Sequence, residues 1–534
     1  MKRYLRIVIT EVIMLLVSIC LSGCDGGGDG GSAPQSFTLT LTKDGSANGT
    51  VVSSPDKINC GPTCEASFDR DTEVTLTVIP DANATFKGWS GACSGTGACT
   101  VKLNAARSVN ATFTLTLHVI SENIYNYFKT FNVNGLPYNW YDSSNETKGA
   151  YANPAEIGFY MLSHIIAYEM RQEWSPSLSD VVSKLGETID LLASWQNGTQ
   201  ASQPNGPNSY DGKVFFQWYW VEWNPPVVGD ANGTNQVVPS IDNAWLAASL
   251  VVIKEFAESN GETELAAKAD NILKNMDFSL WYNSSTKRFF WGTQNNPQGG
   301  GEQDYYSNEN RIVNFMARWS DIEYNRGKFS KEDFQQSLGS LIGSPGTYDG
   351  ITVEKVNWDG SYFTYLSPAL FIKEMDTSYG TDTIDKVTEA QMAYAKDRGY
   401  PAWGISDCAD LEDRGYAERG APPRASGDPL QNKDDGLITP HASALGLITG
   451  YTGMAETNLL ALKNSYPSVY DDRYGFRDSI NLDSESPDYL KTSYKTLTLD
   501  QAWTFIAIGD HLNSTLWKYF YQNESVQNVF GEMY

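Results

Sequence analysis

Segments with apolar residues at helical spacing recur from about residue 116 to the end of the chain, and they set the fold class. We count roughly eleven of them, each long enough for an amphipathic helix. Long stretches rich in Gly, Asn, Trp and Tyr separate the segments. Loops of that length in a compact domain usually carry function. The pattern therefore predicts a large all-α domain over residues 116–534 whose loops hold the functional site.

Residues 1–24 have the features of an export signal. Basic residues precede an apolar run that ends in Leu21-Ser22-Gly23-Cys24. This ending resembles the lipobox of bacterial lipoproteins, in which the cysteine is lipidated and becomes the mature N-terminus; a plain secretion signal is the alternative. Residues 25–36 are Gly-rich and predict a flexible linker. We expect an exported protein, anchored to a membrane of the bacterial cell envelope through lipidated Cys24.

Residues 37–115 predict a small all-β module. Their segments alternate apolar and polar residues, are rich in Thr and Val, and are bounded by turn residues. Four cysteines lie close together in this stretch: Cys60, Cys64, Cys93 and Cys99. An exported chain favours disulfides. Of the three pairings we favour Cys60–Cys64 and Cys93–Cys99, because each closes a loop within one turn region; a zinc site is the alternative.

The net charge of −25 excludes some classes of partner. Nucleic-acid phosphates need Lys and Arg, and a polyanionic substrate is disfavoured for the same reason. Aromatic residues make up 13% of the chain. Aromatic faces stack on the C–H groups of sugars, although a Trp- and Tyr-rich core would have the same composition. We expect a monomer that binds a neutral oligo- or polysaccharide.

Several kinds of site leave no pattern in the sequence. The four histidines form neither HExxH nor a close pair, so we predict no metal and no cofactor. No G-x-S-x-G elbow or P-loop is present. Cys408 with His441 could form a nucleophile and its base, but a lone buried cysteine is usually inert.

Acids beside aromatic residues are the remaining candidates. Glycosidic bonds are hydrolysed by two carboxyl groups in different environments, so that one keeps its proton. Glu222 lies between Trp220 and Trp223, where burial would raise its pKa; a surface position is the alternative. Asp242 lies at a helix start, where Ser240 is the favoured cap. The other acids of this kind are Asp211, Asp359, Asp407, Asp478 and Asp500.

Motifs over about residues 120–525 resemble, in order, the glucoamylase-like domain family. That family includes the endo-β-1,2-glucanases of glycoside hydrolase family 144 and domains of cyclic β-1,2-glucan synthases. The matching motifs include NGLPYNWYD, PSIDNAWLAASLVVIKEF, SNENRIVNFMARWSDI, VNWDGSYFTYLSPALF, QMAYAKDRGYPAWGISDC and LTLDQAW. The resemblance implies an (α/α)6 toroid and inverting hydrolysis without a metal. The segments CGPTC and GWSGACSGTGAC resemble the disulfide-containing bacterial surface repeat related to internalin B repeats, a spacer or adhesive module.

The chain departs from this family at the acids themselves. In the glucanases the motif around SIDNAW carries Asp-x-x-Glu, and both acids matter for activity. The Glu corresponds to Asp242, and the Asp falls on Pro239. In the synthase-associated domains a Glu corresponds to Asp407, and another to Arg477 or Asp478.

We therefore expect a glycoside hydrolase that cleaves a neutral β-glucan, such as β-1,2-glucan, by an inverting two-carboxylate mechanism. The expected catalytic residues are Asp242, Glu222 and Asp407. The expected substrate-binding residues are Asp211, Trp220, Trp223, Asn243, Trp358, Asp359, Trp403, Asp478 and Asp500. A non-catalytic glycan-binding lipoprotein is the first alternative, since an acid is lost at Pro239. A polysaccharide lyase is the second, although lyases act on uronates, which the negative charge disfavours.

Overall fold

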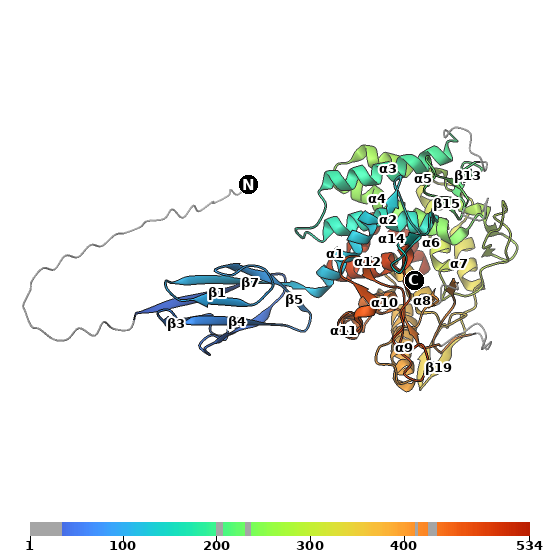
Figure 1. Cartoon of the computed structure of the whole chain (residues 1–534). Helices are drawn as coiled ribbons and strands as arrows, with labels where there is room; N and C mark the ends of the chain where they lie inside the picture. Colours follow the sequence, from blue (N-terminus) through green and yellow to red (C-terminus); the bar gives the residue numbers. More distant parts are fainter. Residues whose placement is uncertain (1–34, 199–206, 230–235, 412–414, 426–434) are drawn as a thin grey trace, which may run out of the picture. The chain divides into compact units, whose positions relative to one another are not determined.

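A computed structural model of the chain describes residues 35–198, 207–229, 236–411, 415–425 and 435–534. The chain divides into an N-terminal unit, which runs to Asp81 and includes Phe86–Phe113, and a C-terminal unit of Ala82–Thr85 and Thr114–Tyr534. Strands build the first and mainly helices the second (Figure 1). The expected order of a small strand-rich module and a large helical domain is confirmed. Cys24 and the export signal lie outside the described residues, within which no helix could cross a membrane.

Two sheets form the N-terminal unit. One has the strand order β3-β1-β7-β5, with β1 parallel to β7, and the other has the order β2-β4-β6. Inward-facing residues such as Leu39, Val51 and Phe113 are fully buried. The disulfides Cys60–Cys64 and Cys93–Cys99 are the two local pairs that the spacing favoured. The strands are β1 (Ser36–Gly45), β2 (Gly49–Ser54), β3 (Glu65–Asp69), β4 (Glu73–Pro80), β5 (Ala84–Gly91), β6 (Cys99–Lys102) and β7 (Arg107–Leu115).

Helices and long loops build the C-terminal unit. The described residues hold α1 (Thr116–Thr130), α2 (Pro154–Glu169), α3 (Leu178–Gln196), α4 (Ser240–Ser259), α5 (Thr263–Asn275), α6 (Asn310–Glu323) and α7 (Lys331–Ser340). They continue with α8 (Tyr362–Leu366), α9 (Asp385–Asp397), α10 (Pro440–Leu445), α11 (Thr452–Ser465), α12 (Thr498–Asn513), α13 (Thr515–Phe520) and α14 (Glu524–Met533). Short strand pairs such as β13 (Ser209–Tyr210) with β14 (Val214–Phe215) stiffen the loops between them.

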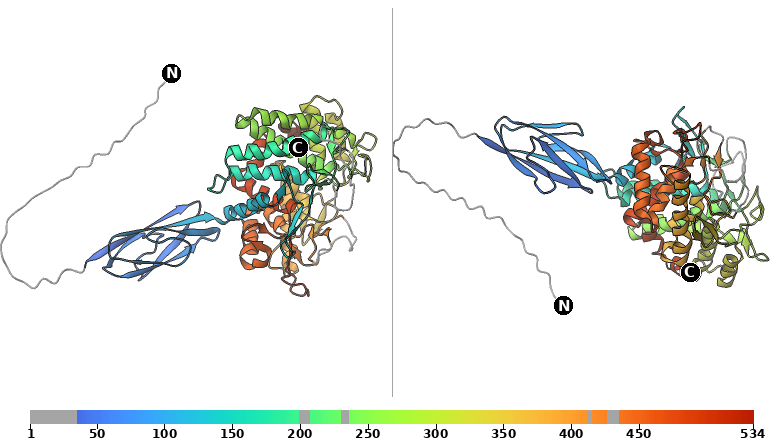
Figure 2. Two further views of the ribbon diagram at one scale, coloured as in Figure 1. Left: turned by 45° about the horizontal axis from the view of Figure 1, so that its top comes forward. Right: turned by 90° about the horizontal axis from the view of Figure 1, so that it is seen from below.

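The helices pack in two layers. In the inner layer α2 contacts α4 and α12, α4 contacts α6, and α10 contacts α8 and α12. In the outer layer α3, α5, α7, α9 and α11 each pack on the inner helix that precedes them in the chain. The inner helices α2, α4 and α12 are buried on almost every side, as expected of apolar helices without a polar face. Figure 2 shows the helices from residues 154–275 running alongside one another.

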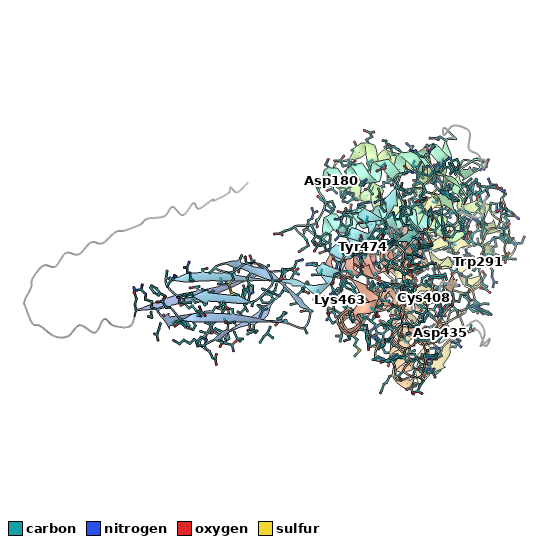
Figure 3. All side chains as sticks on the ribbon, viewed as in Figure 1. Asp180, Trp291, Cys408, Asp435, Lys463 and Tyr474 are labelled. Carbon is teal, nitrogen blue, oxygen red and sulfur yellow. A yellow bond between two sulfur atoms is a disulfide. The ribbon has the colours of Figure 1, made fainter. Side chains whose placement is uncertain are left out.

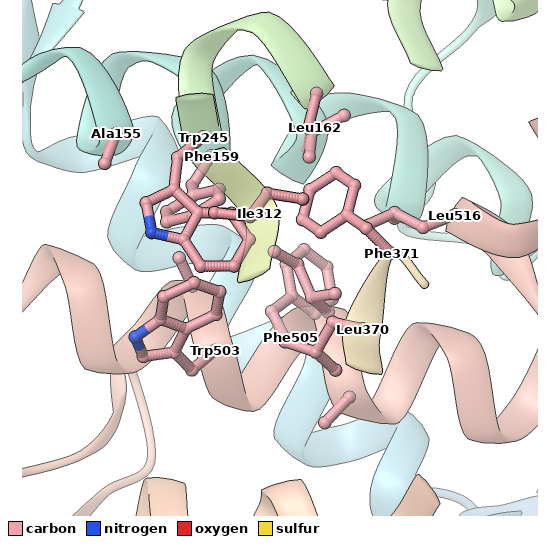
Figure 4. Close-up of a cluster of buried hydrophobic side chains, with 14 of the residues drawn as sticks. Ala155, Phe159, Leu162, Trp245, Ile312, Leu370, Phe371, Trp503, Phe505 and Leu516 are labelled. Carbon is pink, nitrogen blue, oxygen red and sulfur yellow. The ribbon is translucent and has the colours of Figure 1, made fainter. Parts of the chain in front are cut away.

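Aromatic side chains fill the centre of the inner layer. Phe159 of α2, Trp245 of α4 and Trp503 of α12 meet there, with ring centres 4.5 Å apart for Phe159–Trp503 and 5.1 Å apart for Trp245–Trp503 (Figure 4). Much of the tryptophan content is therefore core. Truncating one such ring to alanine typically costs about 3–5 kcal/mol.

A buried ion pair joins α6 to the segment that follows α8. Nε of Arg311 lies 2.8 Å from Oε1 of Glu374, and neither side chain is exposed. Nη2 of Arg311 also donates to the carbonyl of Tyr365 at 2.7 Å. The pairing satisfies both charges, which burial would otherwise penalise heavily.

Candidate active site

Acids occupy the N-terminal ends of the inner helices. Glu156, Asp242 and Asp500 each take the third position of their helix, in α2, α4 and α12. Glu309 is the N-cap of α6, and Asp359 lies two residues before the N-cap of α8. The positive end of a helix dipole favours a negative charge at such positions.

Each of these acids, and Asp407, is coupled by charge repulsion to two others, and we call the set the acid circuit. The charge of Asp242 raises the pKa of both Glu156 and Glu309, and the charge of Asp359 raises the pKa of Glu309 and of Asp407. Asp500 closes the circuit, because the charges of Asp407 and Glu156 raise its pKa. Carboxyl groups from separate helices therefore lie near one another at the N-terminal ends of the inner helices, where they cannot all be ionised at neutral pH.

Pro239 explains why the carboxyl group of Asp242 is available. In α2 the side chain of Asn153 accepts from the backbone N–H of Glu156, and Glu156 in turn accepts from the backbone N–H of Asn153 at 3.1 Å. The N-cap of α4 is Pro239, which has no N–H to donate. No described residue donates a hydrogen bond to Asp242.

Burial sets the proton affinity of Asp242 and Glu309. Burial raises the pKa of Asp242 to about 7. Burial also raises the pKa of Glu309 to about 7, against the lowering effect of a 2.9 Å hydrogen bond from Nε1 of Trp245. Both groups can therefore hold a proton at neutral pH and release it readily, as general acid–base catalysis requires.

A cavity of ≈ 340 Å³ opens beside these acids. Asp359 and Asp407 face each other there, and Asp304, Glu309 and Glu418 add three further carboxyl groups. Aromatic side chains line the rest of the wall: Trp291, Tyr305, Trp358 and Phe363. The ring centres of Tyr305 and Trp358 are 5.7 Å apart. Acids beside exposed aromatic faces suit a neutral, hydroxyl-rich ligand.

Asp359 and Asp407 form a coupled pair. Oδ1 of Asp359 accepts from the backbone N–H of Ser361 at 3.0 Å, and Oδ1 of Asp407 accepts from the backbone N–H of Arg419 at 2.8 Å. Burial raises the pKa of Asp359 to about 6, whereas burial and the charge of Asp359 raise the pKa of Asp407 well above its ordinary value. The charge of one carboxyl group therefore opposes ionisation of the other, and Asp407 holds a proton more strongly than Asp359.

A second cavity, of ≈ 320 Å³, lies beside Glu156. Its walls include Trp140, Tyr151, Trp218, Tyr416 and Lys495. Tyr151 and Trp218 meet edge to face with ring centres 5.0 Å apart. The hydroxyl of Tyr416 donates to the carbonyl of Asp407 at 3.2 Å, so this wall is tied to the first cavity. Two aromatic cavities thus flank the acids.

Of the sequence-predicted residues, Trp358, Asp359 and Asp407 line the first cavity, and the other nine lie outside both linings. Asp242 is one of the nine, although its neighbour Ile241 lines the first cavity. Asp211 is exposed on the β13–β14 turn and pairs with Lys213 at 2.6 Å. Trp220 belongs to the short strand β15 (Tyr219–Trp220). The expected burial of Glu222 between its tryptophans is wrong, because Glu222 is exposed and Trp223 is 52% exposed. Oε1 of Glu222 instead accepts from the hydroxyl of Tyr138 at 3.0 Å.

Three further residues pack differently from what the sequence led us to expect. Asn243 is fully buried, and its amide bonds only to backbone groups of Phe215 and Pro239, so it fastens a loop to α4. Trp403 is buried edge-on against Tyr362 instead of facing a cavity. Ser240 is not the cap of α4: it is the first helical residue, and its hydroxyl accepts from the side-chain amide of Gln303 at 2.8 Å.

Asp478 and Asp500 line neither of the two cavities and lie beside His441. The three side chains are buried and are the one group of potential metal ligands found among the described residues. Cys408 is also buried, and burial raises the pKa of its thiol well above the ordinary value, which leaves it a poor nucleophile.

Sequence reasoning missed Glu156, Glu309, Trp291, Tyr305 and Trp140. The two acids had a signal, since each opens a helical segment as Asp242 does. Trp291 and Tyr305 belong to the loop between α5 and α6, which carries no periodic pattern. Figure 3 labels Trp291 and, on the other side of the helical domain in that view, Asp180.

Residues 314–524 match the family model described as "Putative glucoamylase". Residues 39–116 match the model of the divergent InlB B-repeat domain. Both are the families that the motifs resemble, so that resemblance is confirmed. No curated protein matches the chain by sequence.

Solved structures share the fold of the helical domain. An endo-β-1,2-glucanase from Chitinophaga pinensis, in complex with sophorotriose and glucose, superposes with a TM-score of 0.60 at 17% identity, covering 78% of this chain and 97% of that one. A "putative glucoamylase" from Bacteroides fragilis gives 0.62 at 18% identity, with 78% and 96% covered. A β-1,2-glucanase from Parabacteroides distasonis gives 0.57 at 15% identity, with 94% and 74% covered. Identities this low show a common fold, and the activity has to be argued from the site.

Proposed function

We propose that the protein is an exported glycoside hydrolase that cleaves a neutral β-glucan by an inverting two-carboxylate mechanism. The circuit of acids between two aromatic cavities carries this proposal, because it combines proton donors poised near neutral pH with surfaces that stack on sugars. The two helix layers are those of an (α/α)6 toroid, with the acids at the rim where the inner helices begin. β-1,2-Glucan is the first substrate to test, since two of the similar structures are named as β-1,2-glucanases.

Asp242 is the proposed general acid. Its pKa of about 7 keeps a proton on the carboxyl group at neutral pH, and no described residue occupies its oxygens. It can therefore donate to the glycosidic oxygen of a bound chain. Glu309 has a similar pKa, and the charge of an ionised Asp242 helps Glu309 to keep its own proton.

The Asp359–Asp407 pair is the proposed general base. One negative charge shared by the pair can take a proton from a water molecule that attacks the anomeric carbon. Asp407 was expected to be catalytic from the sequence, and the pairing adds Asp359 as its partner. An inverting mechanism needs about 6.5–9.5 Å between the acid and the base, which leaves room for that water.

The two cavities are the proposed sugar subsites on either side of the acids. Trp291 and Trp358 would stack on sugar rings in one, and Trp140 and Trp218 in the other. Asp478 and Asp500 would hold the residues that line these cavities in place. Asp211, Trp220, Trp223 and Glu222 lie outside these subsites.

The proposal also concerns the location of the protein, for which the N-terminal residues are responsible. Lipidation of Cys24 would anchor the chain, the linker and the disulfide-stapled module of residues 37–115 would act as a spacer, and residues 116–534 would work as a monomer. The two disulfides and the InlB B-repeat match favour an extracytoplasmic compartment.

Release of reducing ends from β-1,2-, β-1,3- and β-1,4-glucans tests the activity. We expect turnover on at least one of them, lost by 100-fold or more in Asp242→Asn and in Asp359→Asn, on the order seen for general acid–base groups. Asp180→Asn is the matched control, because Asp180 has the same helix position in the outer helix α3. NMR of the nascent anomer distinguishes inversion from retention. No release by the wild type from any of these glucans would overturn the hydrolase proposal, and equal release by the wild type and Asp242→Asn would overturn the role of Asp242.

A glycan-binding protein without turnover is the second candidate. It is favoured by one observation, the proline at position 239 where the similar glucanase motif has an acid. Calorimetry that detects binding of a glucan which the wild type does not cleave would support it. An unsaturated product absorbing in the ultraviolet would instead indicate a lyase.

A further inference from the structure

A compact polar cluster shares Asp500 with the acid circuit. It combines His441 in the first turn of α10, Asp500 in the first turn of α12, and Asp478 in the loop between β25 (Gly475–Phe476) and β26 (Ile480–Asn481). One nitrogen or oxygen from each of the three lies within 4.8 Å of the others. None of the three side chains is more than 5% exposed. Residues distant in sequence thus converge at one buried point.

Six buried polar atoms in this cluster have no hydrogen bond from a donor: Nδ1 and Nε2 of His441, Oδ1 of Asp478, both carboxyl oxygens of Asp500, and Oε1 of Gln501. Asp478 and Asp500 hydrogen-bond to each other when one of them is protonated, which satisfies at most one oxygen of each. Buried polar atoms are almost always satisfied, and each unpaired one typically costs about 1–3 kcal/mol. Because so many unpaired polar atoms lie at one point, we infer that a bound molecule or ion satisfies several of them together.

The same residues enclose a small cavity. His441, Asp478, Asp500 and Gln501 line a space of ≈ 10 Å³, which is room for about one water molecule or one ion. A single water donates only two hydrogen bonds, so it cannot satisfy the unpaired acceptors of His441, the carboxyl groups and Gln501 together. A cation can accept lone pairs from a nitrogen and several oxygens at the same time.

We propose that this cavity binds one divalent transition-metal ion of the zinc class, held by His441, Asp478 and Asp500. Gln501 or a water would complete the coordination. The ligand set decides between ions: an imidazole nitrogen suits zinc, whereas calcium takes six to eight oxygens and magnesium keeps its waters. Nδ1 of His441 lies 3.6 Å from Oδ2 of Asp500. Two ligands about 2.1 Å from a tetrahedral zinc are about 3.4 Å apart, so this pair is close to zinc geometry already.

The ion would tie together three elements of the active-site wall. α10 and α12 are neighbours in the inner layer, and Asp478 also accepts a hydrogen bond from the backbone N–H of Ala409, which lines the second cavity. A metal crosslink here would hold that wall in place. The role is structural and does not depend on the proposed hydrolysis.

Sequence reasoning predicted no metal because it looked for closely spaced histidines. A site with one histidine and two aspartates separated by tens of residues has no such signature. Its only sequence trace is the position of His441 and Asp500 in the first turns of their helices.

Metal content of the purified full chain tests the proposal. After exposure to zinc and exhaustive dialysis, we expect about one zinc per chain by mass spectrometry, and none retained after the same treatment with calcium or magnesium. His441→Gln should bind zinc at least tenfold more weakly. His164→Gln is the matched control, because His164 is also buried in the helical domain with a free Nε2. It should keep the zinc.

A second measurement keeps the test valid if His441→Gln misfolds. Cobalt(II) added to the wild-type protein should give the visible absorption of a low-symmetry nitrogen–oxygen site, and one equivalent of zinc should abolish it. Zinc should also raise the melting temperature of the wild type and of His164→Gln. Less than about a tenth of an equivalent of retained zinc in folded wild type, or equal zinc in both histidine variants, would overturn the proposal and leave water as the occupant.

Discussion

Replacing Asp242 by asparagine should stabilise the protein, and the gain should grow with pH. The side chains have the same shape, and no described residue hydrogen-bonds to Asp242, so the substitution removes a costly charge and little else. Burial raises the pKa of Asp242 from its ordinary value of 3.8 to about 7. The folded state therefore resists an ionisation that the unfolded chain undergoes freely.

The size and sign follow from proton linkage. Between pH 4 and pH 7 the folded protein holds the Asp242 proton while the unfolded chain has lost it, so rising pH destabilises the wild type. The difference between 3.8 and about 7, at about 1.4 kcal/mol for each pKa unit, comes to about 4 kcal/mol above pH 7. Partial exposure of the side chain reduces this, and we expect about 2–4 kcal/mol at pH 8.5 and under about 1 kcal/mol at pH 4.

Denaturant unfolding of both proteins at pH 4, 6 and 8.5, followed by helical circular dichroism, measures this difference. Asp180→Asn is the control with the opposite sign. Asp180 sits in a capping box with Ser177 on the exposed face of α3, and those hydrogen bonds lower its pKa. Its contribution is present at neutral pH and lost in acid, so Asp180→Asn should destabilise at pH 8.5 and less at pH 4. The reasoning fails if Asp242→Asn gives the same gain at every pH.

Three further outcomes follow from buried groups. Glu374→Gln leaves Arg311 charged and poorly paired in the core, and should lower the free energy of unfolding by about 3–5 kcal/mol in denaturant titrations. Trp245→Phe removes the hydrogen bond that lowers the pKa of Glu309; the pKa should rise above about 7 by carbon NMR of labelled glutamate, and an unchanged value would contradict the assigned contact. Cys93→Ser opens a short disulfide loop and should cost about 2 kcal/mol in the N-terminal unit, seen by calorimetry as an earlier transition of that unit while the helical transition stays.

The longer helices were predictable because their apolar periodicity is strong. Apolar residues at helical spacing over residues 154–170, 178–195 and 242–259 predict helices there, and α2, α3 and α4 match them closely. The same spacing predicts helices over residues 360–375 and 440–451, which begin as α8 and α10 but turn into 3₁₀ helix at Ser367–Leu370 and Gly446–Ile448. α1 was missed, because Thr116–Thr130 follows a Thr-rich strand directly and its N-cap, Leu115, makes no side-chain cap.

The candidate site was predictable only in part, because aromatic residues occur beside acids both at a cavity and elsewhere in the fold. Aromatic neighbours marked Asp359 and Asp407, and both acids line a cavity together with Trp358. The same signal marked Trp403, whose ring is core, and Glu222, which lies exposed outside both cavities. Adjacency in sequence does not say which face of a loop is buried; that depends on tertiary contacts.

The N-cap residue of a helix separates acids that cap the helix from acids that do not. Acids at the third helical position act as caps in α2, α3 and α7, where the N-cap is Asn153, Ser177 or Ser330 and offers both a side-chain acceptor and a backbone N–H. The N-caps of α4 and α12 are Pro239 and Leu497, and neither has a side-chain acceptor. A capping box cannot form there, so Asp242 and Asp500 are left for other partners, at the mouth of the site and in the buried cluster. An N-cap without a side-chain acceptor therefore leaves an acid at the third helical position outside any capping box, as at Asp242 and Asp500.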